Sequence, residues 1–401
     1  MSRSRVLDAF VRLLLVGFIV VIIMHIDLPM ENYESDPVTV NVEDKMATFD
    51  YASDLTAFDH KFGQTFLSEQ VKEFMAAHKQ NCHPDRLLFG GLMGQSRGLG
   101  FGSYMTNGLS AYHIAQMAQR RFHILHYEWP YEKLTTFFDD FARNTRCPIF
   151  GNMADQQAVT LLNNKNNYHL VYENDSVVVT KEVDLTPVNP SEGFHEMRRI
   201  ITYIYDKDFA GHFRTKSLLA KAMWQLKPHY ADFVKKLMSG VLANGFIGVH
   251  LRRTDKIASK EMANIPIQDF ALKIREVFAS KSYSKCVVFV MTDDQSASDL
   301  LQRLLTDRCS LYTIVDLAKT HGFDPGKLFM DPLHQVKHHV PRTNREYWIK
   351  HTTQLILEMT ILALADDLVC TLSSNLCNVV VLLRGSYNAS VYSLDLPWTP
   401  V

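Results

Sequence analysis

The chain has 401 residues, of which 47% are apolar and 21% are charged, so it can bury a sizeable core and suits about two domains. Its formal net charge of −1 at pH 7 argues against a nucleic-acid-binding protein, because such proteins usually carry a basic face. We therefore predict no nucleic acid among its partners.

The N-terminus carries the membrane signal of the sequence. Residues 13–24 are wholly apolar, and three arginines precede them. This pattern predicts a transmembrane signal-anchor helix over 9–28 behind a cytosolic tail over 1–8, because basic residues stay on the cytosolic side. A cleaved signal peptide is the alternative, disfavoured because no small-x-small cleavage site follows the apolar run. The polar, acidic residues 29–60 are predicted to form a stem.

A strand, a glycine-rich turn, a helix and a second strand are expected in the N-terminal half. Their ranges are 87–92, 98–102, 104–120 and 122–126, in the order found in one half of a nucleotide-binding fold. A plain tight turn explains the glycines equally well, because a lone GxGxG is a weak signal. Residues 206–241 are predicted to be mostly helical, and no chemistry is assigned to them.

From residue 246 onward strands and helices alternate, which predicts a parallel sheet. We expect a C-terminal Rossmann-like domain over 241–401 and an N-terminal α/β and helical domain over 61–240. The segment 317–343 is predicted to be an ordered loop. The predicted strands are 246–251, 286–291, 311–315 and 368–372, and the predicted helices are 266–279, 296–305, 344–364 and one opened by Ser373, Ser374 and Asn375.

Polar clusters follow three of these strands. The clusters are His250 to Lys256, Asp293 with Asp294, and Ser373 to Asn375. They can converge, because ligands of open α/β sheets lie at the carboxyl ends of the strands. Arg252 and Arg253 offer forked donors that match phosphate oxygens, and a helix N-terminus suits a pyrophosphate. The sequence therefore predicts a site for a sugar nucleotide.

Two adjacent carboxylates, Asp293 and Asp294, could form a metal-binding DxD-type site. We favour the other interpretation, in which they orient basic side chains at neighbouring strand tips. Positive charge at the leaving diphosphate then replaces a divalent ion. No metal and no other cofactor are predicted.

The six cysteines fit a luminal body, because an even count there favours disulfides. A bridge between Cys370 and Cys377 would stiffen the loop between them, while the pairing of Cys286 with Cys309 is left open. Two glycosylation sequons give slight support for a luminal address. They are Asn174-Asp-Ser176 and Asn388-Ala-Ser390.

The three strand tips read HLRRTDK, VMTDD and LVCTLSSNLC. In this order they resemble motifs of the α1,6-fucosyltransferases and their relatives, the rhizobial chitooligosaccharide and protein O-fucosyltransferases. The resemblance spans roughly residues 80–400 and is tightest after residue 245. It implies a GT-B-like fold of two Rossmann-like domains and an inverting, metal-independent transfer of fucose from GDP-fucose.

The resemblance also implies roles for matching residues. Arg252 would clamp the pyrophosphate, Lys256 would lie near the acceptor hydroxyl, and Glu261 would act as the base. Arg97 and Asp395 would contact the acceptor. The implied donor-binding residues are His250, Arg253, Asp255, Asp293, Asp294, Glu358, Ser373, Ser374, Asn375, Leu376, Tyr131 and Gly102. The implied disulfide cysteines are Cys82, Cys147, Cys370 and Cys377.

The sequence departs from the family's pattern at three places. Lys260 stands where the family has its base, so a one-residue loop insertion is needed to restore Glu261. Glu358 and Asn375 stand where the α1,6-enzymes have aspartate and glutamine. The C-terminal Src-homology-type barrel and the long helical stem of those enzymes have no counterpart in these 401 residues.

We therefore expect a single-pass type II Golgi membrane protein with a luminal body. Its expected activity is α1,6 transfer of fucose to the innermost N-acetylglucosamine of N-glycans on glycoproteins. The alternatives are a chitooligosaccharide or a protein Ser/Thr hydroxyl as acceptor, and a non-catalytic protein that binds a sugar nucleotide or a glycan.

Overall fold

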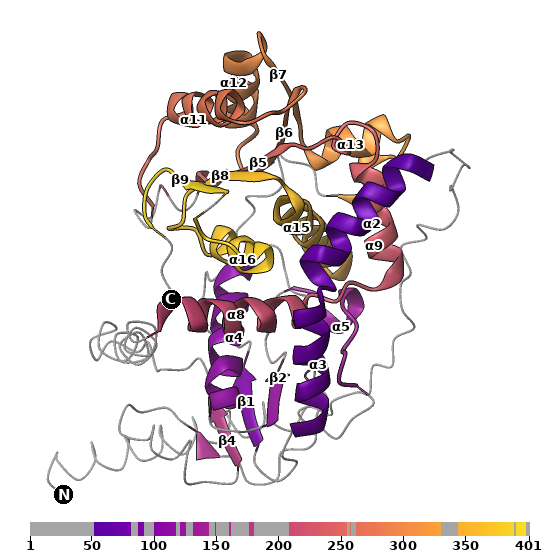
Figure 1. The fold of residues 1–401 in the computed structure, drawn as a ribbon, viewed down its shortest axis with the longest axis vertical. Coiled ribbons are helices and arrows are strands. Elements are labelled where there is room, and N and C mark those ends of the chain that lie inside the picture. Colours follow the sequence, from indigo (N-terminus) through magenta and orange to yellow (C-terminus); the bar gives the residue numbers. More distant parts are fainter. Residues whose placement is uncertain are drawn as a thin grey trace, which may run out of the picture. The chain divides into compact units, whose positions relative to one another are not determined.

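Two parallel β-sheets and the helices around them make up the described part of the protein (Figure 1). The chain is therefore mixed α/β with parallel sheets, as predicted. The described residues all belong to one compact unit, Thr48–Val401. The computed structural model describes residues 52–81, 87–91, 100–117, 121–125, 131–143, 149, 160–161, 176–179, 208–254, 257, 262–329, 344–388 and 390–397.

The C-terminal sheet has the strand order β7-β6-β5-β8-β9, and each neighbouring pair is parallel. The chain runs from β5 outward to β7 and then returns to β8 on the other side of β5. Ligands of open α/β sheets bind where the strand order reverses in this way, which here is between β5 and β8. The strands are β5 (Ile247–Leu251), β6 (Cys286–Thr292), β7 (Cys309–Tyr312), β8 (Asp367–Cys370) and β9 (Val391–Ser393).

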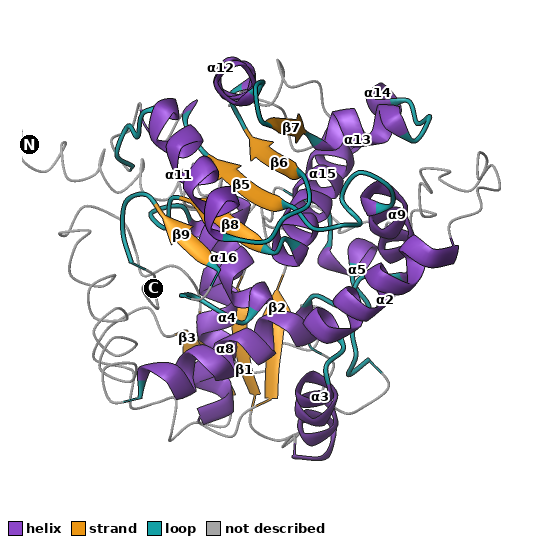
Figure 2. Cartoon of the chain, turned by 45° about the horizontal axis from the view of Figure 1, so that its top comes forward, coloured by secondary structure: helices purple, strands orange, loops and turns teal. Residues whose placement is uncertain are grey.

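Helices cover this sheet on both faces (Figure 2), so all five residues of β5 are buried. On one face α11 (Ile267–Ser280) and α12 (Gln295–Leu305) form a core with strand residues such as Val249 and Val288. On the other face α15 (Arg345–Leu364) packs on β5 and β6, and α16 (Asn375–Arg384) packs on α15.

Two disulfides brace the C-terminal sheet. Cys286 and Cys309 join the first residues of β6 and β7, which settles the pairing that the sequence left open. Cys370 and Cys377 join the end of β8 to the first turn of α16, which confirms the bridge expected there. Cys82 and Cys147 lie outside the described residues.

The N-terminal sheet has the order β2-β1-β4-β3 and is also parallel. Its main helix, α4 (Phe101–Met117), follows β1 as expected and contacts β1 and β2. The strands are β1 (Leu87–Gly91), β2 (Arg121–Leu125), β3 (Thr160–Leu161) and β4 (Ser176–Val179). The other helices are α2 (Ala52–Phe66), α3 (Glu69–Asn81), α5 (Leu134–Phe137), α8 (Phe209–Met223) and α9 (Pro228–Met238).

Two stretches differ from the sequence-based expectation. Helices α8 and α9 are separate, because Pro228 starts a new helix and Leu226 forms a β-bridge with Phe138. Helices α13 (Ile314–Thr320) and α14 (Pro325–Leu328) occupy part of the predicted loop 317–343. A capping box at Thr313 begins α13, and an Asp324 cap followed by a proline begins α14. Both are local signals that the overall composition of the segment does not reveal.

The predicted anchor over 9–28 lies outside the described residues, and α2 begins within the predicted stem. Within the parts of the chain that the structure describes, no helix combines the length and apolar character that crossing a bilayer requires. The predicted domain limits at 61–240 and 241–401 stay predictions.

Gly248 allows α15 to lie close against β5. A Cβ atom at this position would lie 2.8 Å from Ala365 Cβ and 2.9 Å from Leu362 Cδ2. We expect Gly248→Ala to lower the free energy of unfolding by about 1–3 kcal/mol, because strand and helix must separate. Urea unfolding of both proteins measures this.

Gly63 provides the matched control, because a Cβ there meets nothing within 4 Å and the residue lies inside α2. Gly63→Ala should raise stability by roughly 0.5–1 kcal/mol through helix propensity. Equal effects of the two substitutions would contradict the close packing at Gly248.

Candidate active site

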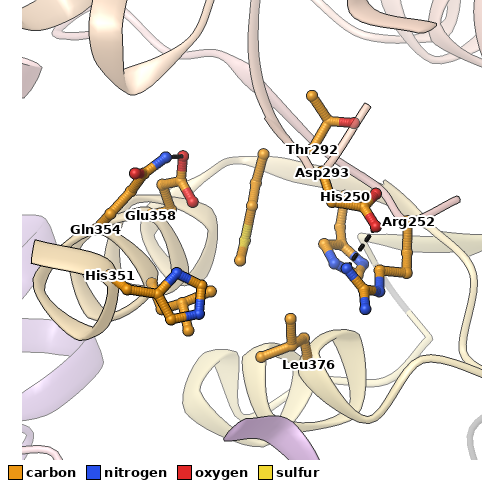
Figure 3. A pocket seen from close by; sticks show the side chains of 10 residues that line it. His250, Arg252, Thr292, Asp293, His351, Gln354, Glu358 and Leu376 are labelled. Carbon is orange, nitrogen blue, oxygen red and sulfur yellow. Dashed lines mark hydrogen bonds and ion pairs between the residues drawn. The ribbon is translucent and has the colours of Figure 1, made fainter. Parts of the chain in front are cut away.

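A pocket lies at the carboxyl ends of β5 and β6, between them and the helices α15 and α16 (Figure 3). It adjoins the switch point described above, because the end of β5 and the start of α16, which follows β8, both line the pocket. Side chains from all four elements face into it, so the polar clusters after β5 and β6 meet the start of α16. Leu376, which follows the third predicted cluster, lines the pocket, whereas Ser373, Ser374 and Asn375 do not. The lining residues are His250, Arg252, Met291, Thr292, Asp293, His351, Gln354, Leu355, Glu358 and Leu376.

Among the described residues that line this pocket, Arg252 is the cation. It follows the last residue of β5, and its Nη1 forms an ion pair with Asp293 Oδ2 at the end of β6. The other Asp293 oxygen accepts the backbone N–H of Arg253 at 2.9 Å, and Thr254 also donates to this carboxylate. Asp293 thereby holds the loop after β5 and aims the guanidinium, which confirms the orienting role expected for it.

The side chain of Arg253, unlike that of Arg252, does not line the pocket. Its guanidinium donates to Ile265 O and Asn264 Oδ1, both at 2.9 Å, and its Nε lies 3.5 Å from Asp294 Oδ2. Asp294 caps α12 by accepting from Ala297 N. These contacts fix the rim of the site, and the predicted donor contacts of Arg253 and Asp294 stay predictions.

His250 and His351 face the pocket as neutral imidazoles. Burial, followed by the charge of Arg252, lowers the pKa of His250 to about 3 and that of His351 to about 4. His250 Nδ1 is buried and has no hydrogen-bond partner among the described residues. A neutral ring that still has a hydrogen-bonding group to satisfy suits a ligand in this pocket.

Glu358 stands across the pocket from Arg252 (Figure 3). It is 5% exposed, and Gln354 Nε2 donates to its Oε1 at 3.1 Å. Burial raises the pKa of this carboxyl to about 8, while the hydrogen bond from Gln354 lowers it. Glu358 is therefore mostly protonated at neutral pH.

The first turn of α16 forms the floor of the site and meets the first turn of α4. A Cβ on Gly102 would lie only 2.5 Å from Leu376 N, so glycine is required for this approach. Asn375 Nδ2 donates to Ser103 Oγ at 2.7 Å, and Ser374 begins α16 without a side-chain cap. Two helix N-termini thus meet, and that of α16 contributes Leu376 to the pocket that Arg252 lines. Backbone N–H groups at such an end suit an anion.

Asp395 braces the turn that leads into α16. Its carboxylate accepts from Leu372 N at 2.8 Å, Ser373 N at 3.3 Å and Ser393 Oγ at 2.9 Å, and also from Ser373 Oγ. These bonds give Ser373 and Asp395 a clear structural function. The acceptor contact expected of Asp395 stays a prediction.

Tyr131 connects the N-terminal part of the chain to α15. Its ring stacks on His351 with centroids 5.8 Å apart, and its hydroxyl bonds to the backbone of Phe101. Burial raises its pKa. Tyr131 thereby packs against His351, which lines the pocket.

Sequence reasoning missed His351 and Gln354. With Glu358 they recur at intervals of three and four residues on α15, and this spacing places them on one helix face. That spacing was the available signal. The predicted site residues outside the described part of the chain are Arg97, Asp255, Lys256 and Glu261. No trio of His, Cys, Asp or Glu side chains is grouped to hold a metal within the described residues.

The sequence matches no protein-family model and no curated protein. The fold is similar to solved structures of fucosyltransferases. Arabidopsis thaliana FUT1, as a mutant with GDP, has 9% identity over 89% of this chain and 82% of that chain, with a TM-score of 0.47. NodZ from Bradyrhizobium has 16% identity over 75% and 93%, with a TM-score of 0.45. POFUT1 with GDP-fucose has 12% identity over 78% and 99%, with a TM-score of 0.42.

Glu358 makes stability depend on pH. Its pKa in the folded state is raised from 4.5 to about 8, so the folded protein binds more protons than the unfolded one between these values. Its contribution to stability is full below about pH 4.5 and is lost as the pH rises towards 8. We expect Glu358→Gln to flatten the fall in unfolding free energy across this window, as measured by urea unfolding at several pH values. Parallel profiles of the two proteins would contradict the raised pKa.

Proposed function

We propose that the protein is a glycosyltransferase with a GT-B-like body that uses GDP-fucose as donor. The observation that carries the proposal is that Arg252 and the N-terminus of α16 lie together at one end of a pocket that also holds neutral His250 and buried Glu358. The pocket is thus cationic at one end and offers an acidic group at the other. This arrangement suits a nucleoside diphosphate, and the strand-tip motifs resemble those of the fucosyltransferases.

Arg252 and the α16 N-terminus have a direct role in this reaction. The bond between fucose C1 and the diphosphate oxygen breaks, and GDP leaves with the bonding electrons. The guanidinium of Arg252 and the positive N-terminal end of α16 stabilise the negative charge that develops on the leaving oxygen. The ion pair with Asp293 keeps the guanidinium oriented before the donor arrives, so little reorganisation is needed.

An acceptor hydroxyl attacks C1 from the opposite side and forms the new C1–O bond, which inverts the anomeric centre. The hydroxyl proton passes to a carboxylate base, for which we propose Glu261, with Lys256 beside the acceptor oxygen. No step in this mechanism requires a metal ion.

For the acceptor we propose the innermost N-acetylglucosamine of N-glycans, joined in α1,6 linkage. The motif resemblance to the α1,6-enzymes supports this choice over a chitooligosaccharide or a protein hydroxyl. A binding-only protein is the competing proposal, favoured by the displacement of Glu261 from the position of the family's base.

Arg252→Ala tests the donor role. We expect fucosyl transfer to fall by at least about a hundredfold, because the leaving group loses its cation. The measurement is transfer to a glycopeptide followed by mass spectrometry. Arg308→Ala is the control, because Arg308 is exposed in the turn between α12 and β7 and is not among the residues that line the pocket. Unchanged turnover in Arg252→Ala would remove this residue from the mechanism.

We also propose a single-pass type II Golgi membrane protein with the body in the lumen. The apolar segment near the N-terminus and its preceding arginines support this topology. Asn388 supports it as well, because this sequon asparagine is exposed in the loop between α16 and β9. The loop enters β9 at its amino end, so a glycan there would not obstruct a pocket at the carboxyl ends.

In cells with a secretory pathway we expect the full-length protein to carry an N-glycan on Asn388. Amidase treatment followed by peptide mass spectrometry detects it. Asn388→Gln should remove the glycan, whereas Ser390→Thr keeps the sequon and should retain it. An unmodified Asn388 in the wild-type protein would contradict the luminal address.

A further inference from the structure

Two pockets meet at one face of α15. The second pocket lies between the end of β6, the start of α13 and α15, and Thr313 and Ile314 are among the residues that line it. It shares Thr292, Asp293, Gln354 and Glu358 with the pocket that contains Arg252. A ligand with a diphosphate at Arg252 can therefore extend past Gln354 and Glu358 into the second pocket.

The surroundings of Glu358 favour its neutral form when no ligand is bound. Its hydrogen bond comes from a neutral amide, Gln354 Nε2. Among the described residues, the charged groups that face the pocket are Arg252 and Asp293, and they are paired with each other. Both imidazoles that face it, His250 and His351, are neutral above pH 5, because their pKa values are lowered to about 3 and about 4. A buried carboxyl among such neighbours keeps its proton, in line with its raised pKa of about 8.

We propose that Gln354 is a positioning residue for Glu358, and that Glu358, whose contact with the donor nucleotide the family resemblance already implies, releases a proton when guanine binds. The inference rests on the proposed use of a GDP donor. Guanine presents two neighbouring N–H donors, and an ionised carboxylate accepts both. The Glu358 O–H proton passes to solvent, and two N–H···O bonds to the carboxylate replace it.

The protonation state of Glu358 also distinguishes the two purines. Adenine presents an N–H donor beside a ring-nitrogen acceptor, which matches a carboxylic acid and not a carboxylate. Guanine binding should therefore strengthen as Glu358 ionises, and adenine binding should weaken. Gln354 sets the pH of this change, because its hydrogen bond to Oε1 favours the ionised carboxyl.

The test measures GDP and ADP binding to the full-length protein in detergent by calorimetry between pH 6 and 9.5. For GDP we expect the affinity to rise by about tenfold per pH unit below pH 8 and to level off above it. Titrations at pH 7 in two buffers of different ionisation enthalpy should show release of about one proton. ADP should bind more weakly as the pH rises.

Three variants separate positioning from simple packing. Glu358→Gln should bind GDP at least about tenfold more weakly at pH 8.5 and without pH dependence, because its amide cannot ionise. Gln354→Met should move the levelling-off to higher pH, because the stabilising hydrogen bond is lost. Gln268→Met, an exposed residue of α11, is the control and should reproduce the wild-type profile.

The outcomes distinguish this inference from the proposed function. GDP affinity that stays constant with pH, without proton release, would overturn proton-linked recognition and leave the GDP donor in place. A Gln354→Met profile identical to wild type would overturn the positioning role. Failure of the wild-type protein to bind GDP at every pH would instead count against the proposed donor.

Discussion

The site depends on an ion pair between the tips of two neighbouring strands. Because β5 and β6 are parallel with Leu251 opposite Thr292, the residues that follow them, Arg252 and Asp293, come out side by side. Asp293 binds the guanidinium with one oxygen and the backbone of Arg253 with the other. The sheet register therefore places a fixed positive charge at the switch point, and this charge also helps to keep His250 and His351 neutral.

The N-terminus of α16 provides a second centre of positive charge, which comes from its backbone N–H groups. The bridge between Cys370 and Cys377 and the carboxylate of Asp395 hold the turn between β8 and α16, so the first turn of α16 is fixed beside Arg252. Gly102 allows α4 to approach this turn at a distance that no side chain permits. Rigid elements thus prepare an anion site, while α15 contributes a carboxyl whose charge can change.

The C-terminal sheet and the convergence of its strand tips were predictable. An apolar run followed by a polar cluster marks the carboxyl end of a buried strand in the sequence itself. Arg252 and Asp293 belong to such clusters. His351 and Gln354 do not, because they lie within a helix whose other faces are also buried, and only the strand order shows which face meets the pocket. The bridge between Cys286 and Cys309 escaped prediction for a similar reason, since it requires knowing that β6 and β7 are neighbours. The separation of α8 from α9 has a local signal in Pro228, but the bridge between Leu226 and Phe138 joins residues that are far apart in the sequence.

We propose that this pocket transfers fucose from GDP-fucose without a metal ion. The most direct measurement incubates the full-length protein with GDP-fucose, EDTA and a glycopeptide whose N-glycan has exposed terminal N-acetylglucosamine, and then examines the product by mass spectrometry. We expect the addition of one fucose to the innermost N-acetylglucosamine. Absence of transfer to this acceptor, to chitooligosaccharide and to protein hydroxyls, while GDP still binds, would contradict it and leave a binding protein.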